Sequence, residues 1–142
     1  MKKSMIAGLV VAVLAAALVS GCVSTPKGPT DEELIAQTVG AWVQATKAKN
    51  IDGMMSCYSQ TFQHAEYGNK AGLQTFLKDA LNMGYMENME VATDKMATKI
   101  EKGEATVYPI QLKAAFGSAT IEFVLKKEAG KWLIVGMTAE EN

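Results

Sequence analysis

The hydrophobic periodicity of the chain changes near residue 90, and this change restricts the folds that the chain can adopt. Between residues 31 and 82, apolar residues recur at spacings of three and four, which is the period of an amphipathic helix. Beyond residue 90 the pattern becomes that of strands, with strict alternation of apolar and polar residues along Ser118–Lys127. Helices followed by an antiparallel meander predict an α+β domain, in which about three N-terminal helices pack on one face of a curled sheet.

Local signals indicate where the three helices begin and end. Thr30 and Glu33 have the spacing of a capping box, so the first helix is expected to start directly after Thr30. A short second helix is predicted at about 52–58. Asn69 is expected to cap the third helix, and Gly84 is a typical residue at which such a helix stops.

Four strands are predicted in the second half of the chain. The first lies within Met89–Ile100 and the second spans Ala105–Phe116, where Pro109 favours an edge or a bulge because proline has no amide hydrogen. The third spans Ser118–Lys127. The fourth spans Lys131–Met137, and because it is apolar on both faces it is expected to be a central strand of the sheet.

At the N-terminus, Lys2 and Lys3 precede an uncharged run, Met5–Val19, which Val19-Ser20-Gly21-Cys22 closes. This pattern resembles a bacterial lipoprotein signal, in which these four residues correspond to the lipobox. The run is shorter than the ~20 apolar residues that a membrane-spanning helix needs. A secretory signal cleaved without lipidation is the alternative, and it leaves the cysteine unexplained. The resemblance implies a diacylglycerol thioether on Cys22, cleavage before it, and acylation of its new amino group with a chain such as palmitate.

This resemblance divides the chain into three parts. Residues 1–21 are expected to be the signal peptide, 22–30 the lipidated cysteine with a flexible proline-bearing tether, and 31–142 the folded domain. Two or three acyl chains on Cys22 would anchor the protein to a membrane of the cell envelope. Val23, in place of an aspartate, favours the periplasmic face of the outer membrane if the host is Gram-negative.

Composition excludes several classes of function. Without Lys2 and Lys3, 12 of the 14 basic residues remain against 15 acidic ones, which is a net charge of about −3, and the chain has no arginine. Nucleic-acid binding is therefore not expected. With Cys22 lipidated, Cys57 has no intramolecular partner; it is expected to be a buried small hydrophobe, with an intermolecular disulfide as the alternative. Motifs for nucleotide, redox or hydrolase cofactors and nucleophiles are missing, so no cofactor is expected.

The domain contains the stretches VGAWVQATKAKNIDGMMSCYS, YGNKAGLQTFL, GEATVYPIQL and FVLKKEAGKWLIVGM. Together they resemble the nuclear-transport-factor-2-like superfamily, which includes ketosteroid isomerases and polyketide-cyclase-like (SnoaL-like) proteins. The resemblance covers about Asp31–Met137. It implies a conical α+β shell whose open end forms an apolar pocket, and dimerisation through the outer face of the sheet.

The resemblance also suggests where catalytic groups would lie. Trp42 stands where the isomerases have a tyrosine that binds an oxyanion, and an indole donates a hydrogen bond but does not exchange a proton as a phenol does. Glu66, with His64 two residues before it, is the candidate general base, and Glu122 the candidate second acid. If the two lay on one strand, His64 and Glu66 would share a face. This chemistry needs an ionised carboxylate beside a neutral one. An isomerase, cyclase or dehydratase with Glu66 or His64 as base is the second hypothesis.

The leading hypothesis is a membrane-anchored envelope lipoprotein that binds a small apolar or amphipathic ligand without catalysis. The side chains expected to line its pocket are Trp42, Tyr58, His64, Tyr85 and Phe123. No metal is expected, because His64 is the only histidine and no nearby cysteine completes a ligand set. A third hypothesis is a structural or protein-interaction lipoprotein that acts as a homodimer.

Overall fold

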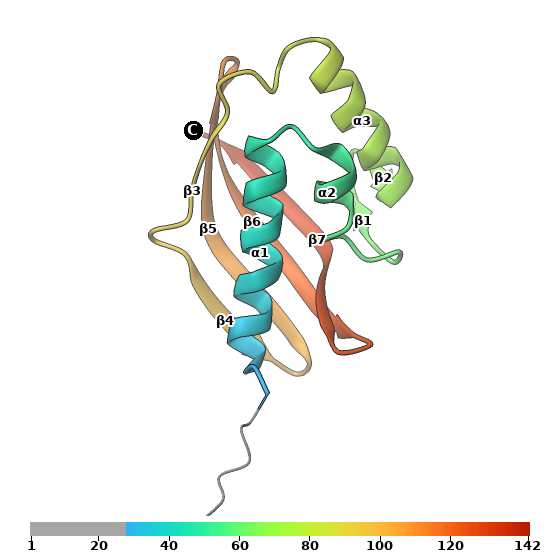
Figure 1. The fold of residues 1–142 in the computed structure, drawn as a ribbon, viewed down its shortest axis with the longest axis vertical. Helices are drawn as coiled ribbons and strands as arrows, with labels where there is room; N and C mark the ends of the chain where they lie inside the picture. The colour runs from blue at the N-terminus through green and yellow to red at the C-terminus, as the bar shows by residue number, and fades with distance from the viewer. Residues whose placement is uncertain (1–27) are drawn as a thin grey trace, which may run out of the picture.

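The computed structural model describes residues 28–142, which form three helices and an antiparallel sheet (Figure 1). The predicted signal peptide, the lipidation site at Cys22 and the tether up to residue 27 lie outside the described residues. None of the helices in the described part of the chain is long and apolar enough to span a membrane. The α+β class and the curled sheet under three helices agree with the expectation from the sequence.

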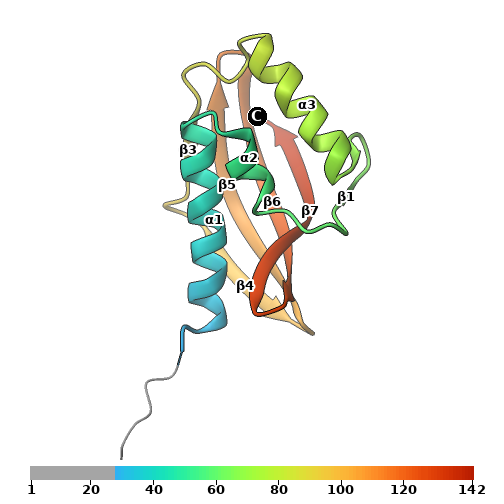
Figure 2. The same ribbon diagram turned by 45° about the vertical axis from the view of Figure 1, so that its right-hand side comes forward.

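Helix α1 (Asp31–Lys47) begins at the predicted capping box. The amide of Glu33 donates to Thr30 Oγ1 over 3.2 Å, and the Thr30 amide donates to Glu33 Oε2 over 2.9 Å, so two amides at the helix start have partners. The residues buried along its inner face follow the helical period: Ile35, Val39, Trp42, Val43, Ala45 and Thr46. This face packs on the sheet and holds α1 along the concave side (Figure 2).

The two shorter helices are capped by asparagines. Asn50 Oδ1 accepts the Gly53 amide over 3.0 Å and starts α2 (Ile51–Met55), which is shorter than the predicted helix at 52–58. Asn69 Oδ1 accepts the Gly72 amide over 3.0 Å and starts α3 (Lys70–Asn82), as predicted. A small hairpin of β1 (Gln63–His64) and β2 (Gly68–Asn69) connects the two helices.

The main sheet has five antiparallel strands, which are β3 (Glu90–Ala92), β4 (Ala97–Glu101), β5 (Glu104–Ala114), β6 (Gly117–Glu128) and β7 (Lys131–Glu141). Their order is β3-β5-β6-β7, and β4 also pairs with β5. The segment predicted as one strand is therefore two short strands, which follow one another along the same edge of β5. Pro109 lies where the register of β5 against β6 shifts, between Val107 and Ile110, and this confirms the predicted bulge.

Strand β7 is an edge strand of the sheet, so the prediction that it is central was wrong. It pairs along its length only with β6, while the segment after α2 covers part of its free edge. There the Ser59 amide donates to the Ile134 carbonyl over 2.8 Å, and the Ile134 amide donates to the Cys57 carbonyl over 2.9 Å. Strand β7 is apolar on its second face because Leu133 lies beside both this segment and α1.

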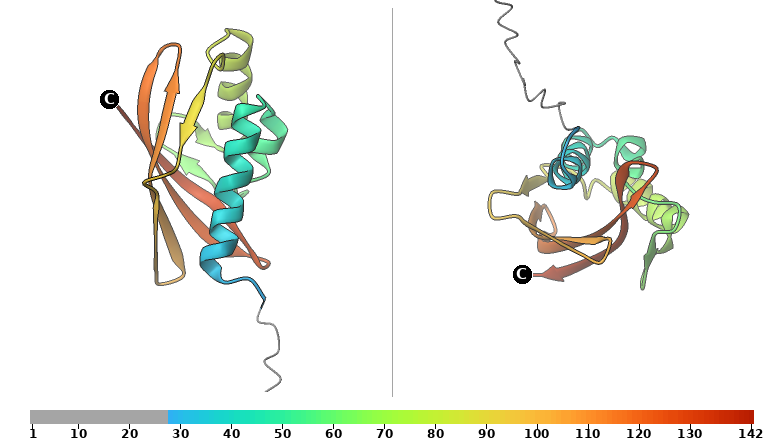
Figure 3. Two further views of the ribbon diagram at one scale, coloured as in Figure 1. Left: turned by 60° about the vertical axis from the view of Figure 1, so that its left-hand side comes forward. Right: turned by 90° about the horizontal axis from the view of Figure 1, so that it is seen from below.

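The curled sheet closes around one core, which α1, α2 and α3 cover from the concave side (Figure 3). Ile121, Phe123 and Leu125 of β6 point inward and are at most 4% exposed, which confirms the alternation predicted for this strand. The chain enters α1 at one end of the molecule, beside the β4–β5 and β6–β7 turns, while the loop after α3 lies at the opposite end (Figures 1 and 3).

Candidate functional site

Three of the predicted pocket residues meet inside the cone and fill it. Trp42 comes from α1, Tyr58 from the segment after α2 and Phe123 from β6; their exposed fractions are 3%, 2% and 0%. The indole of Trp42 packs edge-on against Phe123 with ring centroids 4.9 Å apart, and its Nε1–H donates to Tyr58 Oη over 3.1 Å. The edge-to-face geometry and the satisfied hydrogen bond are those of a close-packed core.

The phenol at the centre of this core is held neutral. Tyr58 also packs edge-on against Phe62, with ring centroids 5.0 Å apart, and its hydroxyl lies 3.9 Å from Met137 Sδ. Burial raises the pKa of Tyr58 far above its usual value, while the hydrogen bond from Trp42 acts in the opposite direction. Burial likewise raises the pKa of the Cys57 thiol. Neither group is therefore a ready proton acceptor at neutral pH.

His64 and Glu66 do not form the acid–base pair that the sequence suggested. His64 is the last residue of β1 and Glu66 lies in the turn that follows, so the two do not share a strand face. His64 Nδ1 accepts the backbone amides of Glu66 over 3.1 Å and of Tyr67 over 3.4 Å. The contact thus involves the amide of Glu66, and its side chain is exposed to solvent.

The imidazole ring instead belongs to a column of stacked aromatic rings at the side of the domain. The ring centroid of His64 lies 6.4 Å from that of Phe62 and 4.4 Å from that of Tyr67. Tyr67 in turn stacks on Phe76 of α3, with centroids 4.4 Å apart. This column attaches the β1–β2 hairpin to α3, which gives His64 a packing role in the fold.

Glu122 and Tyr85 lie apart from the ring cluster as well. Glu122 precedes Phe123 on β6 and pairs with Thr138, so its side chain projects from the opposite, outer face of the sheet. Tyr85 follows α3 and is 49% exposed, with its ring against Phe116 in the β5–β6 turn. The five predicted pocket residues therefore divide into three core side chains and two that lie elsewhere.

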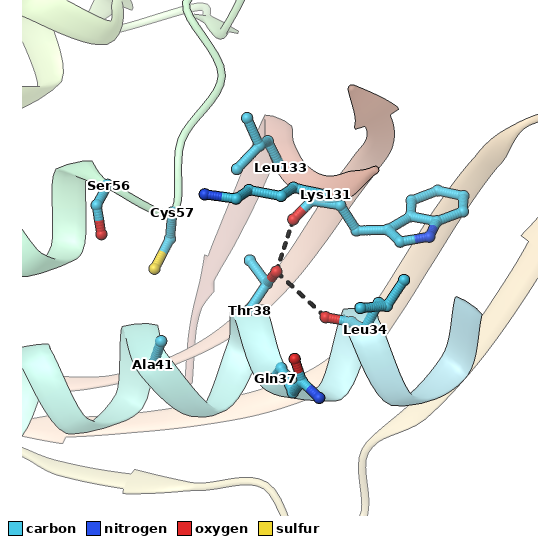
Figure 4. A pocket seen from close by; sticks show the side chains of 9 residues that line it. Leu34, Gln37, Thr38, Ala41, Ser56, Cys57, Lys131 and Leu133 are labelled. Carbon is cyan, nitrogen blue, oxygen red and sulfur yellow. Dashed lines mark hydrogen bonds between the residues drawn. The ribbon is translucent and has the colours of Figure 1, made fainter. Parts of the chain in front are cut away.

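A different hollow, of about 230 Å³, opens on the surface between α1, the end of α2 and the start of β7 (Figure 4). We call it the α1–β7 groove. Its lining comes from α1, from the two residues that follow α2, and from β7: Leu34, Gln37, Thr38, Ala41, Ser56, Cys57, Lys131, Trp132 and Leu133. None of the predicted site residues is among them. The one signal for this hollow in the sequence was the apolar character of both faces of the fourth predicted strand, which indicated that other parts of the chain pack against each face.

The hydroxyl groups of the groove already have partners. Thr38 Oγ1 donates to the Trp132 carbonyl over 2.6 Å, which ties α1 to β7, and Ser56 Oγ donates to the Gly53 carbonyl over 2.6 Å. Lys131 differs, because its ammonium forms no ion pair or hydrogen bond with the described residues. Its side chain extends along the groove toward Ser56 and Cys57 (Figure 4).

A second hollow, of about 280 Å³, lies between α1 and the β3–β4 edge. Its lining residues are Ala36, Val39, Gly40, Val43, Gln44, Lys47, Val91, Thr93 and Met96. It too contains a lysine, Lys47, and it lies between a helix and the β3–β4 segment. Within residues 28–142, no three side chains of the metal-binding types gather into a group that could hold an ion.

The arrangement of the described residues is the nuclear-transport-factor-2-like, or cystatin-like, fold. A protein of unknown function with a cystatin-like fold from Nostoc punctiforme matches 82% of this chain with 96% of its own, at a TM-score of 0.65 and 13% identity. An NTF2-like protein of unknown function from Shewanella oneidensis matches 78% of this chain with 98% of its own, at 0.62 and 13% identity.

A further NTF2-like protein of unknown function, from Shewanella baltica, matches 81% of this chain with 98% of its own, at a TM-score of 0.61 and 17% identity. At these identities the likeness concerns the fold alone. No family model matches the sequence, and no curated protein is significantly similar to it. The function therefore has to be argued from this chain's own groove, core and surface.

Proposed function

We propose that the protein is a lipid-anchored binding domain of the cell envelope, which holds a small apolar or amphipathic ligand in the α1–β7 groove without catalysis. The observation that carries the proposal is the groove itself, with its apolar floor and a single unpaired cation, Lys131. Apolar concavities with a few polar groups are the usual form of small-molecule sites.

The placement of the candidate catalytic residues supports binding over catalysis. An isomerase, cyclase or dehydratase with Glu66 or His64 as base would need one of these side chains to face a cavity beside a hydrogen-bond donor. Glu66 is exposed, the His64 ring is stacked between aromatic rings, and Glu122 projects from the outer face of the sheet. The enzyme alternative thus has no assembled acid–base set in this fold.

Ligand binding is tested by NMR titration of the mature chain, with Cys22→Ser to keep it in solution. Octyl probes are expected to shift the amide signals of Ala41, Cys57 and Leu133 first, since these line the groove. The matched variant Ala41→Leu, which adds bulk at an exposed helix position, should abolish these shifts without unfolding the domain. Shifts confined to residues around Trp42 and Phe123 would instead place the ligand inside the cone and contradict the proposal.

Anchoring at Cys22 is a separate part of the proposal, and fractionation of the full chain expressed in a bacterium tests it. The wild-type protein is expected in the membrane fraction and should incorporate labelled palmitate, because two or three acyl chains anchor firmly. Cys22→Ser should lose the palmitate label, while the control Cys57→Ser should keep the label and remain with the membrane. A Cys22→Ser protein that still incorporates palmitate, or a wild-type protein that does not, would refute lipid anchoring.

Homodimerisation through the outer face of the sheet is the second candidate, and one observation favours it. The described helices cover only the concave face, so side chains such as Val124 and Tyr108, which is 45% exposed, remain uncovered on the other side. Sedimentation equilibrium of the Cys22→Ser chain tests this candidate. A dimer should dissociate with Val124→Lys and persist with Lys126→Gln, and a wild-type monomer would eliminate it.

A further inference from the structure

We infer that the α1–β7 groove is selective for one class of ligand, a small monocarboxylate with a short apolar chain. The carboxylate would pair with the Lys131 ammonium, and the chain would lie over Leu34, Ala41 and Leu133. This inference rests on the proposed function, because it names the ligand chemistry of the same groove. The charge, the size and the hydrogen-bond state of the groove each support it.

The charge of the groove is a lone cation. Lys131 is the only charged residue among the nine that line it. Its neighbours in the sequence are paired: Lys126 lies 3.7 Å from Glu104, and Lys127 lies 2.8 Å from Asp31.

The acid that would be the nearest partner of Lys131 is turned elsewhere. Glu128 stands opposite Lys131 in the register of the β6–β7 hairpin, but it accepts a hydrogen bond from Ser59 Oγ over 3.0 Å. Lys131 is thus left to the groove, and a ligand carboxylate would complement it with a charge-assisted hydrogen bond.

The size of the groove selects a small molecule. Its volume of about 230 Å³ lies below the roughly 300–1,000 Å³ of sites for drug-sized ligands. A folded partner would need a far larger surface than this hollow offers. A short acyl chain is of the right scale, and the apolar side chains of α1 and β7 form the two walls between which it would lie.

The hydrogen bonds of the groove argue against a polyhydroxyl ligand such as a sugar. Thr38 Oγ1 is engaged with the Trp132 carbonyl, and Ser56 Oγ with the Gly53 carbonyl. The thiol of Cys57 contacts the same Gly53 carbonyl over 3.7 Å. A ligand with many hydroxyl groups would lose its water and find few partners, because Gln37 and Lys131 are the only polar side chains of the groove without a hydrogen bond to the described residues. One anionic group on an otherwise apolar body matches what the groove offers.

The experiment compares three probes of equal chain length, octanoate, 1-octanol and octylammonium, by NMR titration or calorimetry on the mature Cys22→Ser chain. Octanoate should bind about threefold more tightly than octanol, which is the worth of one ion pair at a solvent-exposed lysine. Octylammonium should bind the weakest of the three. Lys131→Gln should reduce octanoate affinity about threefold and leave octanol affinity unchanged.

Lys47→Gln is the matched control, because Lys47 is the lysine of the other hollow and should not affect octanoate binding. If octanoate and octanol bind the groove equally well, or Lys47→Gln weakens octanoate as much as Lys131→Gln does, the inference fails while the proposed function stands. If none of the three probes binds the groove, the proposed function fails as well. Both lysines are on the surface, so neither substitution should unfold the domain.

Discussion

Whether the interior of the cone is a dry core can be tested with Tyr58→Phe, which removes a single oxygen atom. It removes the hydroxyl that accepts the indole N–H of Trp42, in a site where both residues are at most 3% exposed. The indole donor would then be buried without a partner, which costs about 2 kcal/mol of unfolding free energy. No cavity opens around the ring itself, so this loss should be nearly the whole effect.

Urea unfolding followed by the fluorescence of Trp42 and Trp132 measures this change. With a denaturant slope between about 1 and 3 kcal/mol/M, a loss of 2 kcal/mol lowers the midpoint by about 1 M. Tyr108→Phe is the matched control, because Tyr108 is 45% exposed and should lose little. A Tyr58→Phe loss no larger than that of the control would mean that water reaches the indole, and that the interior is a wet pocket.

Three further changes follow from local geometry. Gly72→Ala should destabilise the β2–α3 junction, visible as a lower Tm, because a Cβ there would lie 1.9 Å from the Tyr67 carbonyl oxygen; Ala at the open Gly40 is its control. Thr38→Val should cost about 1 kcal/mol in urea unfolding through loss of the bond to β7, whereas Thr75→Val should not lose a tertiary contact. The hydrogen bonds from Lys127 and Trp132 lower the pKa of Asp31 below its ordinary 3.8, so their stabilisation is present above that pH and is lost as the pH falls through the lowered pKa. An Asp31→Asn chain should therefore show a flatter stability profile below about pH 4 in acid titrations followed by circular dichroism; an unchanged profile would refute the role of Asp31.

The helices and their starts were predictable because their determinants are local. The Thr30 and Asn69 caps each act on an amide three residues away, so the signal is contained in four consecutive residues. The bulge at Pro109 is local for the same reason, since the missing amide hydrogen belongs to the residue itself. The alternation along β6 likewise reports directly which of its side chains face the core.

The sites were less predictable because they depend on non-local packing. The free edge of β7 and the α1–β7 groove lie beside a contact between the segment after α2 and Ile134, which are more than 70 residues apart in the chain. The pairing of His64 with Glu66 failed because the strand ends at His64, and turn geometry presents the Glu66 amide to the ring. A separation of two residues in the sequence is compatible with both a strand and such a turn.

Trp42, Tyr58 and Phe123 show why a core and a pocket lining look alike in a sequence, and why this chain forms a core. An empty interior of 230 Å³, the volume of the α1–β7 groove, would cost about 5.5 kcal/mol at roughly 24 cal/mol per Å³ of cavity. That is comparable with the whole stability of many domains of this size. Because the three rings pack together in the interior and the indole N–H of Trp42 has the Tyr58 hydroxyl as its partner, the domain avoids this loss. A hollow on the surface forfeits far fewer contacts, since water occupies it when no ligand does. A packed cone interior and a hollow on the outside of the cone are therefore compatible in one small fold.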